Sequence, residues 1–357
     1  MKMPEGLPHK VKIGNKFVGE GEPAYFISEI GNNHNGDFYL AKRSIEESVK
    51  AGADAVKLQK RFLEEVFTKE LLDTPQTKNQ VLGKTYGEYR KSMELDEEEF
   101  KELKKYSDEL GVTFFATPFD KKSADFLERV GVDVYKIASF DVTNLPLLEY
   151  VAKLGKPIIL SLGISSLEEM DEAIATILGH NNNLILLHCV GIYPAVDETL
   201  NLSTIPFLKE RYAPLPVGYS GHEKDIVPTL STIPLGTKCI ERHFTLDKKL
   251  PGPDHATVSI EPDEFKEMVD STRRIETMLG QPNKIVLEGE QGTRNKHTKS
   301  LVSARDIKKG ETITAEMLTC KSPGTGIKPG RINEVLGKVV RVDIPADKTI
   351  MEDFVEM

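Results

Sequence analysis

Short runs of apolar, often β-branched residues alternate along the chain with longer segments of helical periodicity. Eight such runs occur, at residues 24–30, 55–59, 113–118, 134–139, 157–163, 184–190, 216–220 and 239–245. Runs this short and this apolar predict strands that are buried on both faces, as in a parallel sheet. An earlier pair of segments, residues 11–13 and 16–18, flanks Gly14-Asn15 and predicts an N-terminal hairpin.

The segments between the strands have the start and stop signals of helices. Four of them are clear, at residues 38–51, 97–110, 166–178 and 261–279, and the last three are each followed by glycine. Eight strand–helix units within about 260 residues predict a (β/α)₈ TIM barrel of class α/β. The alternative is a doubly wound open sheet, but the Gly-x-Gly-x-x-Gly loop common in such sheets does not occur in the sequence.

The C-terminal part of the chain has a different pattern. Residues 281–299 are polar and are interpreted as a linker between a barrel domain, residues 1–280, and a small domain, residues 300–357. Within the small domain, residues 306–313 are echoed by residues 343–350, which predicts a compact pseudo-symmetric fold. A domain of this size has a small core, so we expect it to dock on another part of the protein.

Charge and cysteine content narrow the functional classes. The net charge of −9 argues against a nucleic-acid partner. No segment has the apolar length of a signal peptide or a membrane span, so we expect neither. The three cysteines are scattered and form no zinc-binding spacing, which favours a reducing compartment and a cytoplasmic protein.

Polar residues gather where the predicted strands end. In a barrel these ends meet at one rim, which is where the chemistry takes place. Any one of these residues could be purely structural, but their repetition at one rim indicates an active site. The residues are Glu29, Lys57, Gln59, Lys136, Ser139, Asp141, Ser161, Tyr193, Ser220, His222, Glu241, Arg242 and His243.

His222 and His243 follow neighbouring predicted strands, about one strand–helix unit apart. Two imidazoles without further His or Cys ligands are typical of an open, catalytic metal site. We expect a divalent cation, Mn²⁺ first, with Mg²⁺ and Co²⁺ as alternatives. The competing interpretation is a pair of unrelated core histidines. Arg242, which directly precedes His243, is expected to neutralise a neighbouring buried carboxylate such as Glu241.

Lys57 and Lys136 lie within apolar strands, where a charge requires a partner. Together with nearby serine hydroxyls they predict a pocket for a phosphate and a carboxylate. The same pattern is also compatible with a Schiff-base aldolase or lyase, in which one desolvated lysine is the nucleophile.

Ordered motifs over nearly the whole chain resemble the N-acetylneuraminate (sialic acid) synthases and their relatives that make legionaminic and pseudaminic acid. The motifs are SEIGNNHNG, KLQ, ATPFD, YKIAS, ILSLG, HCVGIYP, GYSGH, ERHFT and PGPDH. The segment DIKKGETITAEML, with PGTGI after it, resembles their antifreeze-like (SAF) domain. A non-catalytic sugar- or ice-binding protein is a third interpretation, suggested only by this small domain.

The resemblance implies that phosphoenolpyruvate (PEP) condenses with an N-acetylated mannose-type sugar and water to give a nonulosonic acid and phosphate. It assigns PEP binding to Lys57, Lys136, Ser139, Ser161 and Ser220. It places toward the sugar Gln59, Tyr193 and Asp254. It makes catalytic carboxylates of Glu29 and Asp141, and implies that a metal on His222 and His243 polarises the aldehyde.

The resemblance also implies a homodimer in which the SAF domain of one subunit caps the barrel of the other. Three positions depart from the common pattern of sialic acid synthases. Asp141 replaces Glu, Gly191 replaces Asn, and Ser322 replaces a capping Arg for which Lys321, Lys328 or Arg331 could substitute. These departures leave open whether the sugar is N-acetylmannosamine or a 2,4-diacetamido-6-deoxy relative.

Overall fold

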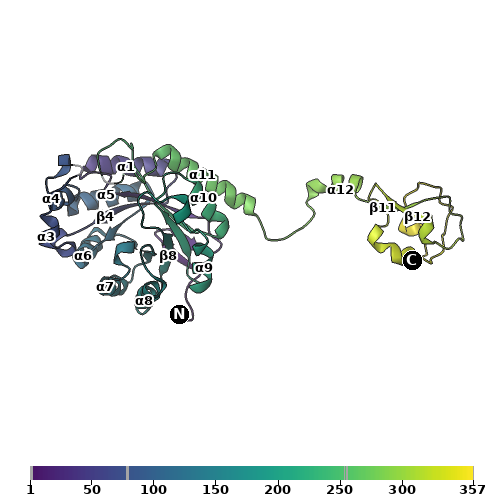
Figure 1. Ribbon diagram of the computed structural model, residues 1–357, viewed down its shortest axis with the longest axis horizontal. Coiled ribbons are helices and arrows are strands. Elements are labelled where there is room, and N and C mark those ends of the chain that lie inside the picture. Colours follow the sequence, from purple (N-terminus) through teal and green to yellow (C-terminus); the bar gives the residue numbers. More distant parts are fainter. Residues whose placement is uncertain (1–2, 78–79, 253, 255, 357) are drawn as a thin grey trace. The chain divides into compact units, whose positions relative to one another are not determined.

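The computed structural model describes residues 3–77, 80–252, 254 and 256–356. The chain divides into two compact units, residues 1–280 (unit 1) and residues 281–357 (unit 2). Figure 1 shows their ribbons, with a cylinder of strands and helices in unit 1. Each unit has its own hydrophobic core.

Unit 1 is a closed barrel of eight parallel strands in the order β10-β3-β4-β5-β6-β7-β8-β9. The strands are β3 (Tyr25–Gly31), β4 (Ala55–Lys60), β5 (Thr113–Pro118), β6 (Tyr135–Ile137), β7 (Ile158–Ser161), β8 (Leu184–Cys189), β9 (Val217–Gly221) and β10 (Cys239–His243). All eight coincide with the predicted apolar runs. The TIM barrel is therefore confirmed, as is the N-terminal hairpin of β1 (Lys10–Ile13) and β2 (Lys16–Gly19).

Helices surround the strands and cover their outward faces (Figure 1). They are α1 (Phe38–Lys50), α2 (Leu63–Val66), α3 (Lys69–Leu72), α4 (Tyr86–Lys91), α5 (Glu97–Glu109), α6 (Lys121–Val130), α7 (Leu145–Lys153), α8 (Leu167–Leu178), α9 (Thr204–Arg211), α10 (Val227–Thr232) and α11 (Pro262–Leu279). The four clear helices of the sequence are α1, α5, α8 and α11. The β4–β5 connection is the longest, because it carries four helices, α2 to α5.

Local chemistry explains where these helices begin. The Asp37 carboxylate accepts hydrogen bonds from the backbone amides of Tyr39 and Leu40 at the start of α1. Ser166 and Glu169 form a reciprocal capping box at the start of α8. Such caps satisfy amides that have no partner within the helix. They fix the points at which the chain leaves the rim of the barrel.

Unit 2 is built around an antiparallel pair, β11 (Ser300–Ser303) and β12 (Leu318–Lys321). Its helical segments after residue 300 are η6 (Ala315–Met317), η7 (Pro329–Arg331), α13 (Ile332–Val335) and η8 (Glu352–Phe354). The predicted repeat is visible in its core, where the backbones of Ile307 and Ile344 exchange two hydrogen bonds of 2.8 Å. Within the predicted linker, residues 291–297 form a short helix, α12 (Gln291–His297).

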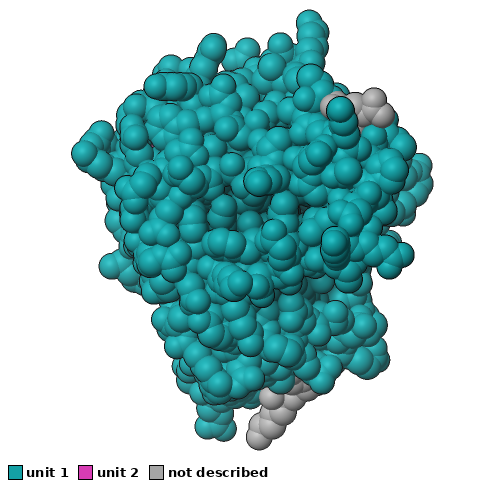
Figure 2. All heavy atoms as spheres, turned by 90° about the vertical axis from the view of Figure 1, so that its left-hand side faces the viewer, with its two compact units in different colours: residues 1–280 teal, residues 281–357 magenta. Residues whose placement is uncertain are grey.

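Figure 2 shows one face of unit 1 in teal, with side chains packed closely over it. In the described part of the chain, no helix has both the length and the apolar character needed to cross a membrane.

Candidate active site

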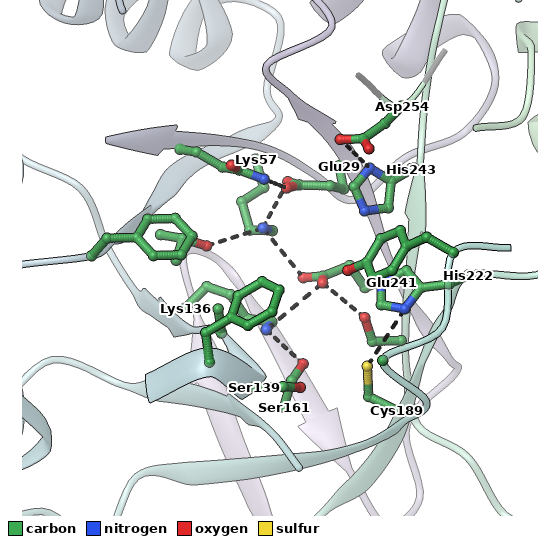
Figure 3. Close-up of a pocket in the computed structure, with 18 of the residues that line it drawn as sticks. Glu29, Lys57, Lys136, Ser139, Ser161, Cys189, His222, Glu241, His243 and Asp254 are labelled. Atoms are coloured by element: carbon green, nitrogen blue, oxygen red, sulfur yellow. Dashed lines mark hydrogen bonds and ion pairs between the residues drawn. The ribbon is translucent and has the colours of Figure 1, made fainter. Parts of the chain in front are cut away.

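A cavity of about 260 Å³ is lined by side chains from all eight barrel strands or the loops that follow them. Eleven of the twelve residues to which the family resemblance assigns a role line it. They are Glu29, Lys57, Gln59, Lys136, Ser139, Ser161, Tyr193, Ser220, His222, His243 and Asp254. Figure 3 shows part of this lining. The structure therefore brings together side chains that are spread over more than two hundred residues of sequence, as expected for the rim of a barrel.

The first cluster joins β3 to β4. The Lys57 ammonium group lies 2.7 Å from Glu29 Oε2 and donates a hydrogen bond of 3.1 Å to Thr117 Oγ1. Gln59 Nε2 donates a hydrogen bond of 2.6 Å to the other Glu29 oxygen. Burial raises the pKa of Glu29, and Lys57 acts in the opposite direction. Lys57 and Gln59 reach the same space because alternate residues of a strand share a face.

The second cluster surrounds Glu241 on β10. Its carboxylate accepts a hydrogen bond of 3.0 Å from Ser220 and lies 3.7 Å from Lys136 Nζ and 3.8 Å from Lys57 Nζ. Lys136 Nζ also donates a hydrogen bond of 2.6 Å to Ser161 Oγ. Burial alone would raise the pKa of Glu241, but the two lysines, with the Ser220 hydrogen bond and His222, act in the opposite direction, and the pKa is lowered. Burial lowers the pKa of Lys136. Figure 3 shows these contacts as one connected network.

Arg242 neutralises a buried carboxylate, as predicted, but that carboxylate is Glu223 and not the suggested Glu241. Arg242 is fully buried on the outward face of β10, where its Nη1 donates a hydrogen bond of 2.8 Å to Glu223 Oε1. It donates further hydrogen bonds to Thr229 Oγ1 and to the carbonyl oxygens of Glu223 and Asp225. Neighbours in a strand point to opposite faces, so Arg242 cannot reach the interior that Glu241 and His243 share.

His222 and His243 lie together at the ends of β9 and β10, with ring centroids 5.4 Å apart. The Tyr193 ring stacks on His222 at 4.0 Å between centroids. His222 Nδ1 is 2.8 Å from the Val190 carbonyl oxygen, and Asp254 Oδ2 is 3.9 Å from His243 Nδ1. Burial, with His222 next in importance, lowers the pKa of His243 well below its ordinary value. Pro253 and His255, which flank Asp254 in the predicted loop, lie outside the described residues.

Asp141 is the predicted site residue that does not line the cavity. It is buried in η2 (Ser139–Asp141) and accepts a hydrogen bond of 2.9 Å from Asn144 Nδ2. Burial raises the pKa of its carboxyl group. Gly191 does line the cavity, and a Cβ added at that position would collide with Ile164 Cγ2. An asparagine at position 191 would therefore require the side chain of Ile164 to move.

Several lining residues were not predicted from the sequence, chiefly Arg61, Arg90 and Cys189. Arg61 could have been found, because it follows Lys57 and Gln59 at the same two-residue spacing. Arg90 lies on α4, far along the β4–β5 connection, and no periodicity marks it. Cys189 ends β8, and its Sγ is 3.8 Å from His222 Nδ1.

Of the three cations proposed to replace a capping Arg, Lys321 and Arg331 form ion pairs within unit 2. Lys321 Nζ lies 2.5 Å from Asp347 Oδ1. Arg331 forms ion pairs with Glu334 and Glu352. Ser322 Oγ accepts a hydrogen bond of 2.9 Å from Lys299 Nζ.

Comparison with known proteins gives this site a context. Residues 44–284 match the NeuB family and residues 298–356 match the SAF domain. An N-acetylneuraminate-9-phosphate synthase of Mus musculus is 39% identical over 342 residues, which cover 96% of this chain and 95% of the mouse protein. An N,N'-diacetyllegionaminic acid synthase of Legionella pneumophila is 38% identical over 350 residues, covering 96% of this chain and 98% of that protein.

A solved structure agrees with these sequence matches. The N-acetylneuraminic acid (sialic acid) synthetase of Leptospira borgpetersenii superposes with a TM-score of 0.69 at 34% identity, covering 81% of this chain and 96% of that one. The matches extend over both the barrel and the small C-terminal domain. The chain is thus a synthase-type enzyme that belongs to the NeuB family and carries a SAF domain at its C-terminal end.

Proposed function

We propose that this enzyme condenses PEP with the open-chain aldehyde of an N-acetylated mannose-type sugar and water, giving a nonulosonic acid and inorganic phosphate. The observation that carries the proposal is the grouping of two buried lysines, three serines and two histidines around one cavity in a NeuB-family chain. The names of its relatives, which include sialic, legionaminic and pseudaminic acid synthases, support the product class.

PEP occupies the end of the cavity around Lys136. Here the Lys136 ammonium group donates a hydrogen bond to Ser161. Glu241 lies close to the same ammonium group and accepts a hydrogen bond from Ser220. Ser139 completes the set, and its Oγ accepts a hydrogen bond of 2.9 Å from the Gly163 amide. Cationic and hydroxyl donors together suit a substrate with both a phosphate and a carboxylate group. Lys57, in the middle of the cavity, holds the other anionic group of PEP.

The reaction needs groups that move protons while the new bonds form. C3 of PEP supplies the electron pair for the bond to the aldehyde carbon, and the aldehyde oxygen takes up a proton. A water oxygen then bonds to C2, and phosphate leaves as the C2–O bond breaks. Glu29 is suited to exchange protons here, because burial raises the pKa of its carboxyl group and a buried lysine lies against it. Asp141 is assigned a supporting proton-shuttle role.

The two histidines fit a divalent cation, for which we propose Mn²⁺, with Mg²⁺ or Co²⁺ as alternatives. His243 Nδ1 is buried without a hydrogen-bond partner among the described residues, and the lowered pKa keeps the ring neutral, as metal ligation requires. The contact of His222 Nδ1 with the Val190 carbonyl leaves its Nε2 for ligation. The described residues contain no group of three or more His, Cys, Asp or Glu side chains arranged around an ion, so water and substrate would complete the shell. A bound cation would polarise the aldehyde oxygen.

The sugar lies toward Gln59, Tyr193 and Asp254, which also line the cavity. Residues with amide, phenol and carboxylate groups suit hydroxyl and acetamido groups. We further propose that the protein is a cytoplasmic homodimer in which the SAF domain of one subunit caps the barrel of its partner. The three free cysteines, of which Cys320 is exposed, fit a reducing compartment.

A Schiff-base aldolase is the second candidate, and it is favoured by one observation, the lowered pKa of Lys136. Its test is treatment with pyruvate and borohydride, which would trap a covalent adduct on Lys136 or Lys57. We expect no adduct, because both ammonium groups are held by carboxylates.

The proposed function is tested by incubating the protein with PEP, Mn²⁺ and a panel of sugars that includes N-acetylmannosamine and its 2,4-diacetamido-6-deoxy relative. Phosphate release that depends on both PEP and one sugar supports the proposal. Release without any sugar, or no release with any of them, contradicts it.

A further inference from the structure

We propose that the sugar end of the cavity contains a second anion subsite, made by Arg61 and Arg90, that binds a phosphate ester on the acceptor sugar. The substrate class would then be an N-acetylated hexose phosphate instead of a neutral sugar. This inference rests on the proposed function and makes its sugar more specific.

Arg61 is a buried cation with an unused donor. The residue is only 7% exposed, and its guanidinium lies over the Phe119 ring at 3.8 Å from the centroid. Nη2 donates a hydrogen bond of 2.6 Å to Gln59 Oε1, whereas Nη1 is buried and has no hydrogen-bond partner among the described residues. A buried charged donor left without an acceptor is costly, so an acceptor from a ligand would be strongly favoured.

Arg90 brings a second guanidinium to the same cavity from α4. Its Nε donates a hydrogen bond of 2.9 Å to the Tyr86 hydroxyl, and its guanidinium lies over the Tyr86 ring. Burial, together with the neighbouring Arg90, lowers the pKa of Arg61 to about 10, so Arg61 remains charged at neutral pH. Two like charges facing one space are stabilised when an anion lies between them.

The charges of the cavity are balanced everywhere except at this end. Lys57 lies against Glu29, and Lys136 lies close to Glu241. Over the described ranges, neither arginine has a carboxylate within ion-pair distance. Asp254 is the lining acid that faces both of them, and its single carboxylate offsets one of the two guanidinium charges. The arginines are thus available to an anion from outside the protein.

This anion is distinct from PEP. The contacts run in sequence from Arg61 through Gln59, Glu29, Lys57 and Glu241 to Lys136. Of the two ammonium groups assigned to PEP, Lys57 is separated from Arg61 by two side chains and Lys136 by four. Two arginines are well suited to a phosphate ester, because each guanidinium can donate two parallel hydrogen bonds to its oxygens.

The test is calorimetric binding of N-acetylmannosamine 6-phosphate and of N-acetylmannosamine to the full-length protein and to three variants. Arg61→Gln and Arg90→Gln remove the proposed contacts. Arg129→Gln is the matched control, because Arg129 is an exposed residue paired with Glu97. We expect the phosphate ester to bind more tightly than the neutral sugar. Each cavity variant should weaken that binding about 10- to 100-fold, which corresponds to the loss of a charged hydrogen bond. The control variant, PEP binding and neutral-sugar binding should change less than about twofold.

The inference is overturned if the ester binds no more tightly than the neutral sugar, or if the arginine variants weaken the binding of PEP instead of the binding of the ester. Turnover assays distinguish failure of the anion subsite from failure of the proposed function. Phosphate release from PEP with neutral sugars alone would retain the proposed function and reject the subsite. Tight ester binding that the variants abolish, without PEP-dependent turnover of any sugar, would retain the subsite and reject the proposed function.

Discussion

The Glu29 carboxylate lies 2.7 Å from the Lys57 ammonium group, and both side chains are almost fully buried. The two residues are directly paired in register on the adjacent strands β3 and β4. A charge in the interior of a barrel is stable only with such a partner, so this ion pair offsets the cost of burying the Lys57 side chain where an anionic substrate would bind.

Replacing Lys57 by methionine should destabilise the protein in a pH-dependent way. The pKa of Glu29 is already raised, so the folded protein keeps this proton to higher pH than the unfolded chain, and stability falls as pH rises through that window. Without Lys57 the pKa rises further. We expect Lys57→Met to cost about 3 kcal/mol at neutral pH and clearly less near about pH 5, as measured by urea unfolding. An equal loss at both pH values would contradict this account of the pair.

Arg242 should matter for stability and not for chemistry. Arg242→Met leaves the buried Glu223 without its cation, which should cost about 3–5 kcal/mol in unfolding free energy. The double variant with Glu223→Gln should recover much of this loss. Turnover per folded molecule should stay near the wild-type value in both. If Arg242→Met were fully stable but inactive, the structural assignment would be wrong.

Alanine at His222 or His243 should abolish Mn²⁺ binding while the barrel stays folded. Metal binding is measured by calorimetry and the fold by circular dichroism, and the loss of activity follows from the loss of the cation. His188→Gln is a suitable control, because His188 is buried against the Leu200 carbonyl and does not line the cavity. Undiminished Mn²⁺ affinity in either alanine variant would reject the two-histidine site.

The proposed capping of one subunit by another gives a complementation test. A chain ending at Gly280 keeps the complete core of unit 1, so it should fold and bind metal but lose most condensation activity. Mixing full-length His243→Ala with a variant whose residues 321–331 are replaced by glycine and serine should partly restore activity. In the heterodimer, one active site then has both an intact barrel and an intact SAF cap. An active full-length monomer would refute the swapped arrangement.

The sequence predicts the barrel well because strands that are buried on both faces must be apolar along their whole length. Eight such apolar runs are visible in the sequence. The rim residues follow from the rule that strand ends meet, which is why Lys57, Lys136 and His243 are all found in the cavity. What was missed depends on side-chain direction. Neighbours in a strand diverge, so the buried carboxylate that Arg242 neutralises is Glu223, just beyond β9, and not Glu241, the example that its place in the sequence suggests.

Other parts of the site could not be predicted from pattern alone. Arg90 reaches the cavity through tertiary packing of a short helix in the longest connection, and no local signal records this. Gly191 is explained only by its neighbour Ile164, whose side chain fills the space a larger residue would need.

The central claim is that PEP is consumed by carbon–carbon bond formation with cleavage of its C–O bond. The most direct measurement uses PEP labelled with ¹⁸O in the bridging oxygen, together with the sugar that gives turnover, and follows the label by mass spectrometry. The account predicts equal amounts of a nine-carbon keto acid and inorganic phosphate, with the bridging ¹⁸O in the phosphate. Label retained in the keto acid, or phosphate formed without a carbon–carbon product, would contradict it.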